Sequence, residues 1–132
     1  NRFYQPDIDL ETLTVIPNVM LSTAFDARVP LRWIAILYDN VKAHLAHTGG
    51  IHTHEDVIKT LLAGAQVAMT ASALLKHGID HAEGMLTQME RWLEENEYES
   101  VQQMRGSMSQ KNCADPAAFE RANYIKALET YM

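Results

Sequence analysis

The chain has 132 residues, of which 17 are acidic and 11 basic, so its formal net charge is −6 when its six histidines are counted as neutral. An acidic chain with no run of Lys or Arg is unsuited to sequence-independent binding of nucleic acid. Apolar residues make up 47% of the sequence, which excludes a disordered chain. The length predicts a single domain.

The sequence also indicates the cellular compartment of the protein. Its apolar stretches are too short for a transmembrane helix, and the opening residues do not resemble a signal peptide. The one cysteine, Cys113, has no partner for an internal disulfide, which is typical of a reducing compartment. We therefore expect a cytoplasmic protein, in which Cys113 is structural or incidental rather than a nucleophile.

The first third of the chain is expected to hold a loop, a hairpin and a helix. Residues 1–11 are polar and predict a loop. Two β-branched runs, 12–16 and 19–23, are separated by Pro17-Asn18 and predict the two strands of a β-hairpin. From Val29 onward, apolar residues recur at helical spacing, so a helix is expected to start there.

The middle of the chain predicts a strand–helix–strand–helix unit. The strands are expected at 43–48 and 66–70, and the helices at 54–63 and 71–75. Thr53 with the carboxylate three residues later is a capping box for the first of these helices. Parallel strands need such a crossover helix, so we expect the two strands to pair in parallel.

The C-terminal third predicts mainly helix. An apolar stripe at 86–93 indicates an amphipathic helix with its glutamates in solvent, and Ser100 with Gln103 forms a second capping box. Residues 106–114 are small and polar and predict a loop. Asp115-Pro116 is typical of a helix start. The expected buried side chains are Trp33, Leu86, Met89, Trp92, Leu93, Phe119, Ala122, Ile125 and Leu128.

Two turns in the middle unit are candidates for binding phosphate. Gly49-Gly50 follows the first strand, and glycine lets backbone N–H groups approach a ligand closely. Ala71-Ser72 follows the second strand, at the start of a helix, where free N–H groups and the helix dipole favour an anion. Adjacent strand ends of this kind share a phosphate in (β/α)₈ barrels. The alternative is that the glycines only form a tight turn.

Four histidines, His44, His47, His52 and His54, lie within eleven residues. Their spacing does not match a helical metal-binding pair, and no cysteine joins them, so we do not predict a metal site. We expect ordinary strand and loop histidines near the phosphate turns. His52 or His54 is the candidate for contacting a bound anion.

Several segments of the chain resemble the C-terminal part of dihydroorotate dehydrogenase-like proteins, which are FMN-dependent TIM (β/α)₈ barrels. The resemblance covers essentially the whole chain and is carried by these stretches: NRFYQPDIDLE, PLRWIAI, TGGIHTHEDVIKTLLAGA, ASALLKHG, EYES and RGSMSQKNCADP. It implies an α/β fold that forms the last part of such a barrel, with the layout 1–28 loop and hairpin, 29–78 βα units, and 79–132 C-terminal helices.

The resemblance also implies a cofactor site. The family binds the FMN phosphate between the last two strand ends, where Gly49, Gly50, Thr70, Ala71 and Ser72 occupy the matching positions. It further implies that Asn1 faces the substrate. In the family reaction, dihydroorotate is oxidised to orotate in pyrimidine synthesis, and the flavin accepts the hydride.

The length limits what this chain is expected to do alone. A complete barrel takes about 250 residues, and the flavin-facing lysine and the catalytic Cys or Ser of the family have no counterpart here. We therefore expect the chain to anchor FMN without catalysing the reaction. Open strand edges predict a homo-oligomer or pairing with the remainder of a barrel. The alternatives are a non-catalytic phosphate-binding or self-associating module, and another phosphate-binding barrel.

Overall fold

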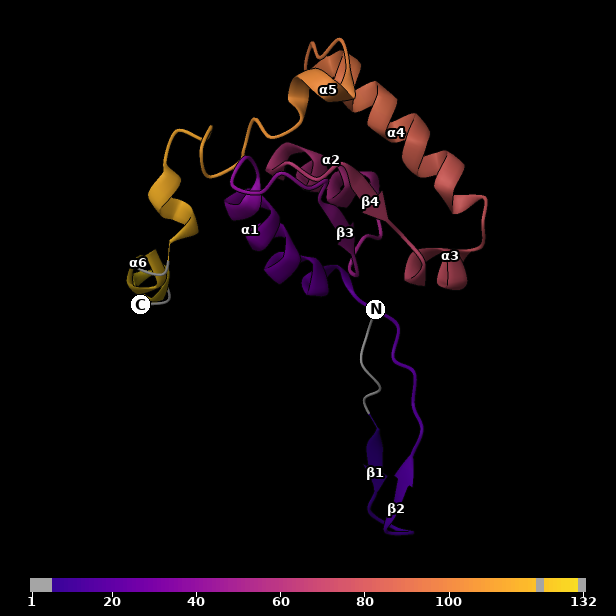
Figure 1. Ribbon diagram of the computed structural model, residues 1–132. Helices are drawn as coiled ribbons and strands as arrows, with labels where there is room; N and C mark the ends of the chain where they lie inside the picture. The colour runs from indigo at the N-terminus through magenta and orange to yellow at the C-terminus, as the bar shows by residue number, and fades with distance from the viewer. Residues whose placement is uncertain (1–5, 121–122, 131–132) are drawn as a thin grey trace.

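The computed structural model of the protein describes residues 6–120 and 123–130. Asn1, the predicted substrate contact, lies outside the described residues. The fold is mixed α and β, about half helical, with two small sheets (Figure 1). The elements in chain order are β1 (Asp7–Asp9), β2 (Thr14–Ile16), η1 (Ala24–Ala27), α1 (Arg28–Leu37), β3 (Ala46–Thr48), α2 (His54–Ala63), β4 (Val67–Met69), α3 (Ser72–His77), α4 (His81–Glu95), α5 (Val101–Met104), η2 (Pro116–Phe119) and α6 (Asn123–Glu129).

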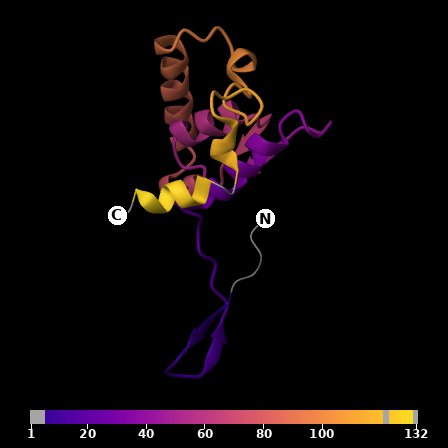
Figure 2. The same ribbon diagram turned by 90° about the vertical axis from the view of Figure 1, so that its left-hand side faces the viewer.

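The predicted hairpin exists, but one of its strands is a different segment. β2 lies within the predicted run 12–16, and its antiparallel partner is β1 rather than 19–23. The Asp9 carboxylate explains the choice, because it accepts the N–H groups of Glu11 and Thr12 at 2.8 and 3.1 Å and so closes the turn between β1 and β2. The hairpin projects away from the rest of the molecule in both ribbon views (Figures 1 and 2).

The strand–helix–strand unit forms as predicted. β3 and β4 pair in parallel, with His47 opposite Ala68. The helix between them spans the predicted residues 54–63, because Thr53 and Asp56 form a reciprocal capping box at its start and Gly64 adopts a left-handed conformation at its end. Because the strands are parallel, their carboxyl ends lie at the same end of the sheet.

Among residues 6–120 and 123–130, helices cover only one face of this sheet. Helices α1 and α2 pack on it and form a core of Ile34, Ala35, Ala63 and Ala65. The alternate side chains of the strands point the other way, and Val67 and Met69 are 48% and 52% exposed. The β3–β4 sheet therefore presents an open face and two open edges.

The loop after α5 ties the ends of the two core helices together. The N–H of Gly106 donates to Leu61 O at 3.0 Å, and the N–H of Gln110 donates to Ala35 O at 3.0 Å. Both carbonyls lie in the last turn of their helix, and Leu61 O accepts the N–H of Gly64 as well. The ring of Tyr38, which follows α1, lies against Gly64 and Gly106. The loop predicted at 106–114 is thus an ordered part of the core.

Several burial predictions are wrong. Trp33, Leu86, Ile125 and Leu128 are exposed, whereas Met89, Trp92, Leu93 and Phe119 are half-buried. The last helix does not run on from Pro116, because Glu120 is extended, with ψ 155°, and separates η2 from α6. α6 lies at the side of the molecule (Figure 2). Its apolar side chains Tyr124, Ile125 and Leu128 are exposed. Ala122 lies outside the described residues.

Candidate functional site

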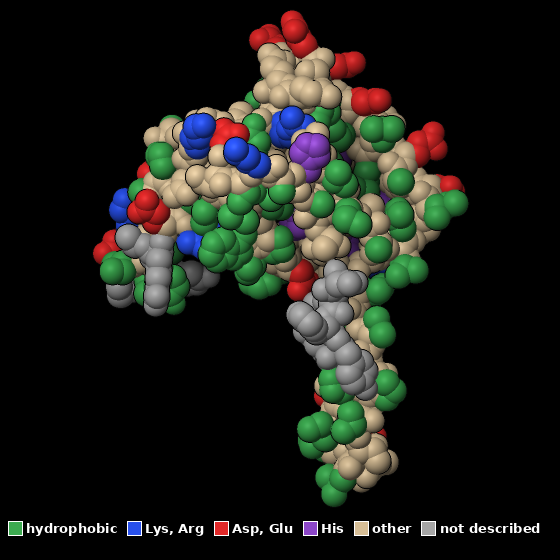
Figure 3. All heavy atoms as spheres, in the orientation of Figure 1, with side chains coloured by type: hydrophobic (Ala, Val, Ile, Leu, Met, Phe, Trp, Pro, Cys, Tyr) green, Lys and Arg blue, Asp and Glu red, His purple; other side chains and the backbone are tan. Residues whose placement is uncertain are grey.

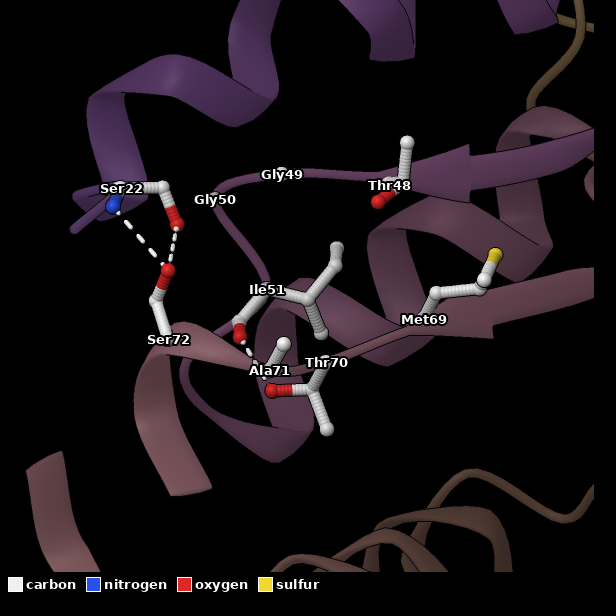
Figure 4. A pocket seen from close by; sticks show the side chains of 9 residues that line it. All are labelled: Ser22, Thr48, Gly49, Gly50, Ile51, Met69, Thr70, Ala71 and Ser72. Carbon is white, nitrogen blue, oxygen red and sulfur yellow. Dashed lines mark hydrogen bonds between the residues drawn. The ribbon is translucent and has the colours of Figure 1, made fainter. Parts of the chain in front are cut away.

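A pocket of about 330 Å³ lies at the carboxyl ends of β3 and β4 (Figure 4). It is built from the two turns that follow these strands and from the segment that enters η1. The turns predicted to bind phosphate are therefore brought together, and all five predicted cofactor-binding residues line one pocket. The lining residues are Ser22, Thr48, Gly49, Gly50, Ile51, Met69, Thr70, Ala71 and Ser72.

The two glycines have different structural roles. Both have positive φ values, 91° at Gly49 and 81° at Gly50, which side chains rarely tolerate. A Cβ on Gly49 would meet nothing within 4 Å, so the turn is open there to a close ligand. A Cβ on Gly50 would overlap the backbone of Ala27, with Ala27 Cα only 2.8 Å away. Gly50 therefore lets the turn pack on η1, while Gly49 leaves space beside it.

Ser72 is held by a residue that the sequence analysis missed. Its Oγ accepts hydrogen bonds from the N–H of Ser22 at 3.1 Å and from the Oγ of Ser22 at 2.9 Å (Figure 4). Because the Ser72 oxygen accepts both bonds, its own proton is left to donate elsewhere. Ser22 is buried and lies fifty positions before Ser72, and no local pattern around it marks it as a site residue.

Thr70 positions the turns rather than facing a ligand with its hydroxyl. Its Oγ1 donates to the carbonyl of Ile51 at 2.8 Å and so joins the two turns (Figure 4). Ala71 precedes α3, which has only six residues. So short a helix contributes little dipole, so the groups that could hold an anion are the backbone amides of the turns and the Ser72 hydroxyl.

This arrangement suits the phosphate end of a small molecule. Glycine-rich turns at strand ends, with hydroxyl donors beside them, bind phosphate through many short contacts. No Lys or Arg is among the residues that line this pocket. Ligand pockets usually measure about 300–1,000 Å³, so this one is at the small end of that range and has room for a group of about the size of a phosphate with a short linker.

His52 is the predicted histidine closest to the pocket. Its Nε2 lies 3.4 Å from Ser22 Oγ, and its carbonyl accepts a hydrogen bond from His81 Nε2 at 2.8 Å. His54 begins α2 and lines a separate depression on the surface. In the described part of the chain, no three His, Cys, Asp or Glu side chains lie close enough together to hold a metal ion.

His47 is the histidine inside the core, directly before the Gly49-Gly50 turn. It is 1% exposed, and its Nδ1 pairs with Thr60 Oγ1 of α2 at 2.7 Å. Burial lowers the pKa of this imidazole, and the backbone of Gly49 and the charge of Asp56 oppose that shift only in part. The folded protein therefore favours neutral His47.

The stability of the protein is expected to fall in mild acid because of His47. The unfolded imidazole has a pKa near 6.5, above that of the folded state. The stability that depends on neutral His47 is thus complete above pH 6.5 and is lost as the pH drops below it. Urea unfolding between pH 8 and pH 5 should show this loss, and His47→Asn should reduce it.

His44 is the matched control for that experiment, because its side chain is exposed. His44→Asn makes the same substitution at a ring outside the core, so it measures what the loss of an exposed histidine does by itself. An equal change in the two variants, or an unchanged profile for His47→Asn, would contradict the assignment of the effect to the buried ring.

The described residues form no helix that is long and apolar enough to cross a membrane. No model of a known protein family matches the sequence, and a search among curated proteins finds no relative.

Proposed function

We propose that this chain is the C-terminal portion of an FMN-dependent, dihydroorotate dehydrogenase-like oxidoreductase, and that it anchors the phosphate of FMN. The observation that carries the proposal is the pocket between the ends of β3 and β4, into which the two expected phosphate turns converge. The order of strand, glycine turn, helix, strand and small-residue turn is the one that (β/α)₈ barrels use for phosphate.

The open face of the β3–β4 sheet supports the barrel part of this proposal. Parallel sheets are normally covered on both faces, yet Val67 and Met69 project from a face that nothing in the described chain covers. In a barrel these side chains would point into the packed interior. The partner we propose for this face is the remainder of a barrel.

In this scheme the chain's own residues bind and orient. The turn amides at Gly49-Gly50 and Ala71-Ser72 hold the phosphate, Ser72 donates its proton to a phosphate oxygen, and Thr70 fixes the distance between the turns. The flavin, when bound, supplies the hydride-accepting chemistry of the oxidoreductase. We expect no turnover of dihydroorotate by this chain alone.

Titration of FMN into the purified chain, followed by quenching of flavin fluorescence, tests the proposal. We expect saturable binding, and Ser72→Ala should weaken it about tenfold, the effect of losing one charge-assisted hydrogen bond worth about 1.5 kcal/mol. Ser107→Ala is the matched control, because the Ser107 hydroxyl is buried, outside the pocket, and without a hydrogen-bond partner among the described groups. It should bind FMN as the unmodified chain does.

Absence of binding up to millimolar FMN by a folded chain would refute the cofactor assignment. Equal weakening by Ser72→Ala and Ser107→Ala would also count against it, because the effect would then not be local to the pocket. Binding of inorganic phosphate without any preference for FMN would support the alternative, a phosphate-binding module without flavin.

A further inference from the structure

The projecting hairpin is the most exposed apolar feature of the molecule. We call residues 6–21 the arm. Along it, apolar side chains point into solvent on both strands, at the tip and in the segment that returns to the body (Figure 3). Those between 63% and 86% exposed include Ile8, Leu10, Leu13, Val15 and Val19.

The arm has few contacts with its own body. β1 and β2 pack on each other and make little contact with any other described element. A two-stranded hairpin by itself is marginally stable in water, and a contiguous apolar surface of this kind marks an interaction site. Ile8 and Val15 are directly paired across the strands, so they present one joint apolar surface to a partner.

A second surface has the complementary chemistry. We call it the aromatic face: Phe25, Val29 and Trp33, spaced four residues apart along η1 and α1, are 74%, 67% and 52% exposed. Arg28 lies over the ring of Phe25, with its guanidinium carbon 5.2 Å from the ring centroid, and Arg32 lies 5.3 Å from the ring centroid of Trp33. The aromatic face is therefore apolar with two ordered positive charges.

The charges of the two surfaces are opposite. The arm carries Asp7, Asp9 and Glu11 and no basic residue. Two arms would therefore repel each other if they paired, because like charges would face one another across the strands. Asp26 is the one acidic residue of the η1–α1 segment, and its carboxylate accepts the N–H of Thr23 at 2.7 Å. The two arginines thus dominate the charge of the aromatic face.

We propose that the arm docks on the aromatic face of a second copy of this chain. Each copy would contribute its arm and its aromatic face, so the same two contacts occur twice around a two-fold axis and the assembly closes as a dimer. The arm points away from its own α1 (Figures 1 and 2), so a second copy supplies the face that its own body does not. This inference is independent of FMN.

Sedimentation velocity of the full chain at about 100 μM tests the dimer. We expect a dimer that weakens as salt is raised, because close charge pairs at a surface are screened. Arg28→Glu and Glu11→Lys should each raise the dimer dissociation constant tenfold or more. The double variant should regain the affinity of the unmodified dimer, because Glu at position 28 and Lys at position 11 again form a pair of opposite charges.

Lys42→Glu is the matched control, since it makes the same charge change at an exposed site away from both surfaces. It should leave the dimer intact. Phe25→Ser should dissociate the dimer without lowering the unfolding free energy of the body, because Phe25 is exposed.

A monomer at 100 μM would overturn the proposal. A dimer that survives Arg28→Glu, Glu11→Lys and Phe25→Ser would overturn it as well, because its interface would then lie elsewhere on the molecule. Failure of the double variant to recover the dimer would show that the two charges do not face each other.

Discussion

Gly50→Ala is expected to destabilise the protein by about 3 kcal/mol and to abolish the pocket at the ends of β3 and β4. Two costs add. The residue has φ 81°, and a Cβ would overlap the backbone of Ala27, which cannot move without shifting η1. A shift of η1 would also distort the pocket, because η1 directly follows the segment that holds Ser22 against Ser72. Urea unfolding and FMN titration of the same sample measure both effects.

Gly49→Ala is the matched control, one residue away. Its φ is 91°, so it carries a similar backbone cost of about 1 kcal/mol. A Cβ there would meet nothing within 4 Å, so no packing cost follows. Equal destabilisation by the two substitutions would show that Gly50 is needed only for its conformation, and would contradict the close contact with η1.

Gly106→Ala is expected to have the second large effect, about 3 kcal/mol, far from the pocket. Gly106 has φ 78°, and a Cβ there would overlap the ring of Tyr38, whose hydroxyl oxygen would be 2.7 Å away. The same glycine donates its N–H to Leu61 O at the end of α2. Thermal unfolding should show a lower melting temperature, with FMN affinity unchanged at temperatures where the protein is folded.

Gly78→Ala provides the comparison, because Gly78 has φ 88° and open space around it. Its cost should be limited to about 1 kcal/mol of backbone strain. Replacing Tyr38 by Leu in the Gly106→Ala protein should recover part of the lost stability, since the smaller side chain leaves room for the Cβ. No recovery would argue against the ring contact as the cause.

The local signals predicted the elements that local chemistry decides. The capping box at Thr53 and the left-handed Gly64 set both ends of α2, so its bounds could be read from the sequence. The short strands on either side of α2 could also be predicted, because turn residues mark where they end. The hairpin partner was missed because the turn depends on one carboxylate, Asp9, which organises backbone N–H groups where propensity alone indicated a loop.

Burial was harder to predict, because it depends on what lies opposite a side chain. Trp33 and Ile125 have the spacing of core residues, yet they are 52% and 66% exposed. The same limit applies to the site. The glycine and small-residue turns were visible as patterns, whereas Ser22 reaches Ser72 only through the tertiary fold. His47 was foreseen as a strand histidine, but its pairing with Thr60 was not.

We propose above all that the two turns hold a phosphate that belongs to a flavin nucleotide. Isothermal titration calorimetry with FMN and with riboflavin tests it most directly, because the two ligands differ by the phosphate alone. We expect FMN to bind at least tenfold more tightly than riboflavin, and Gly50→Ala to remove this difference. Equal affinity for the two ligands, or an FMN preference that survives Gly50→Ala, would contradict it.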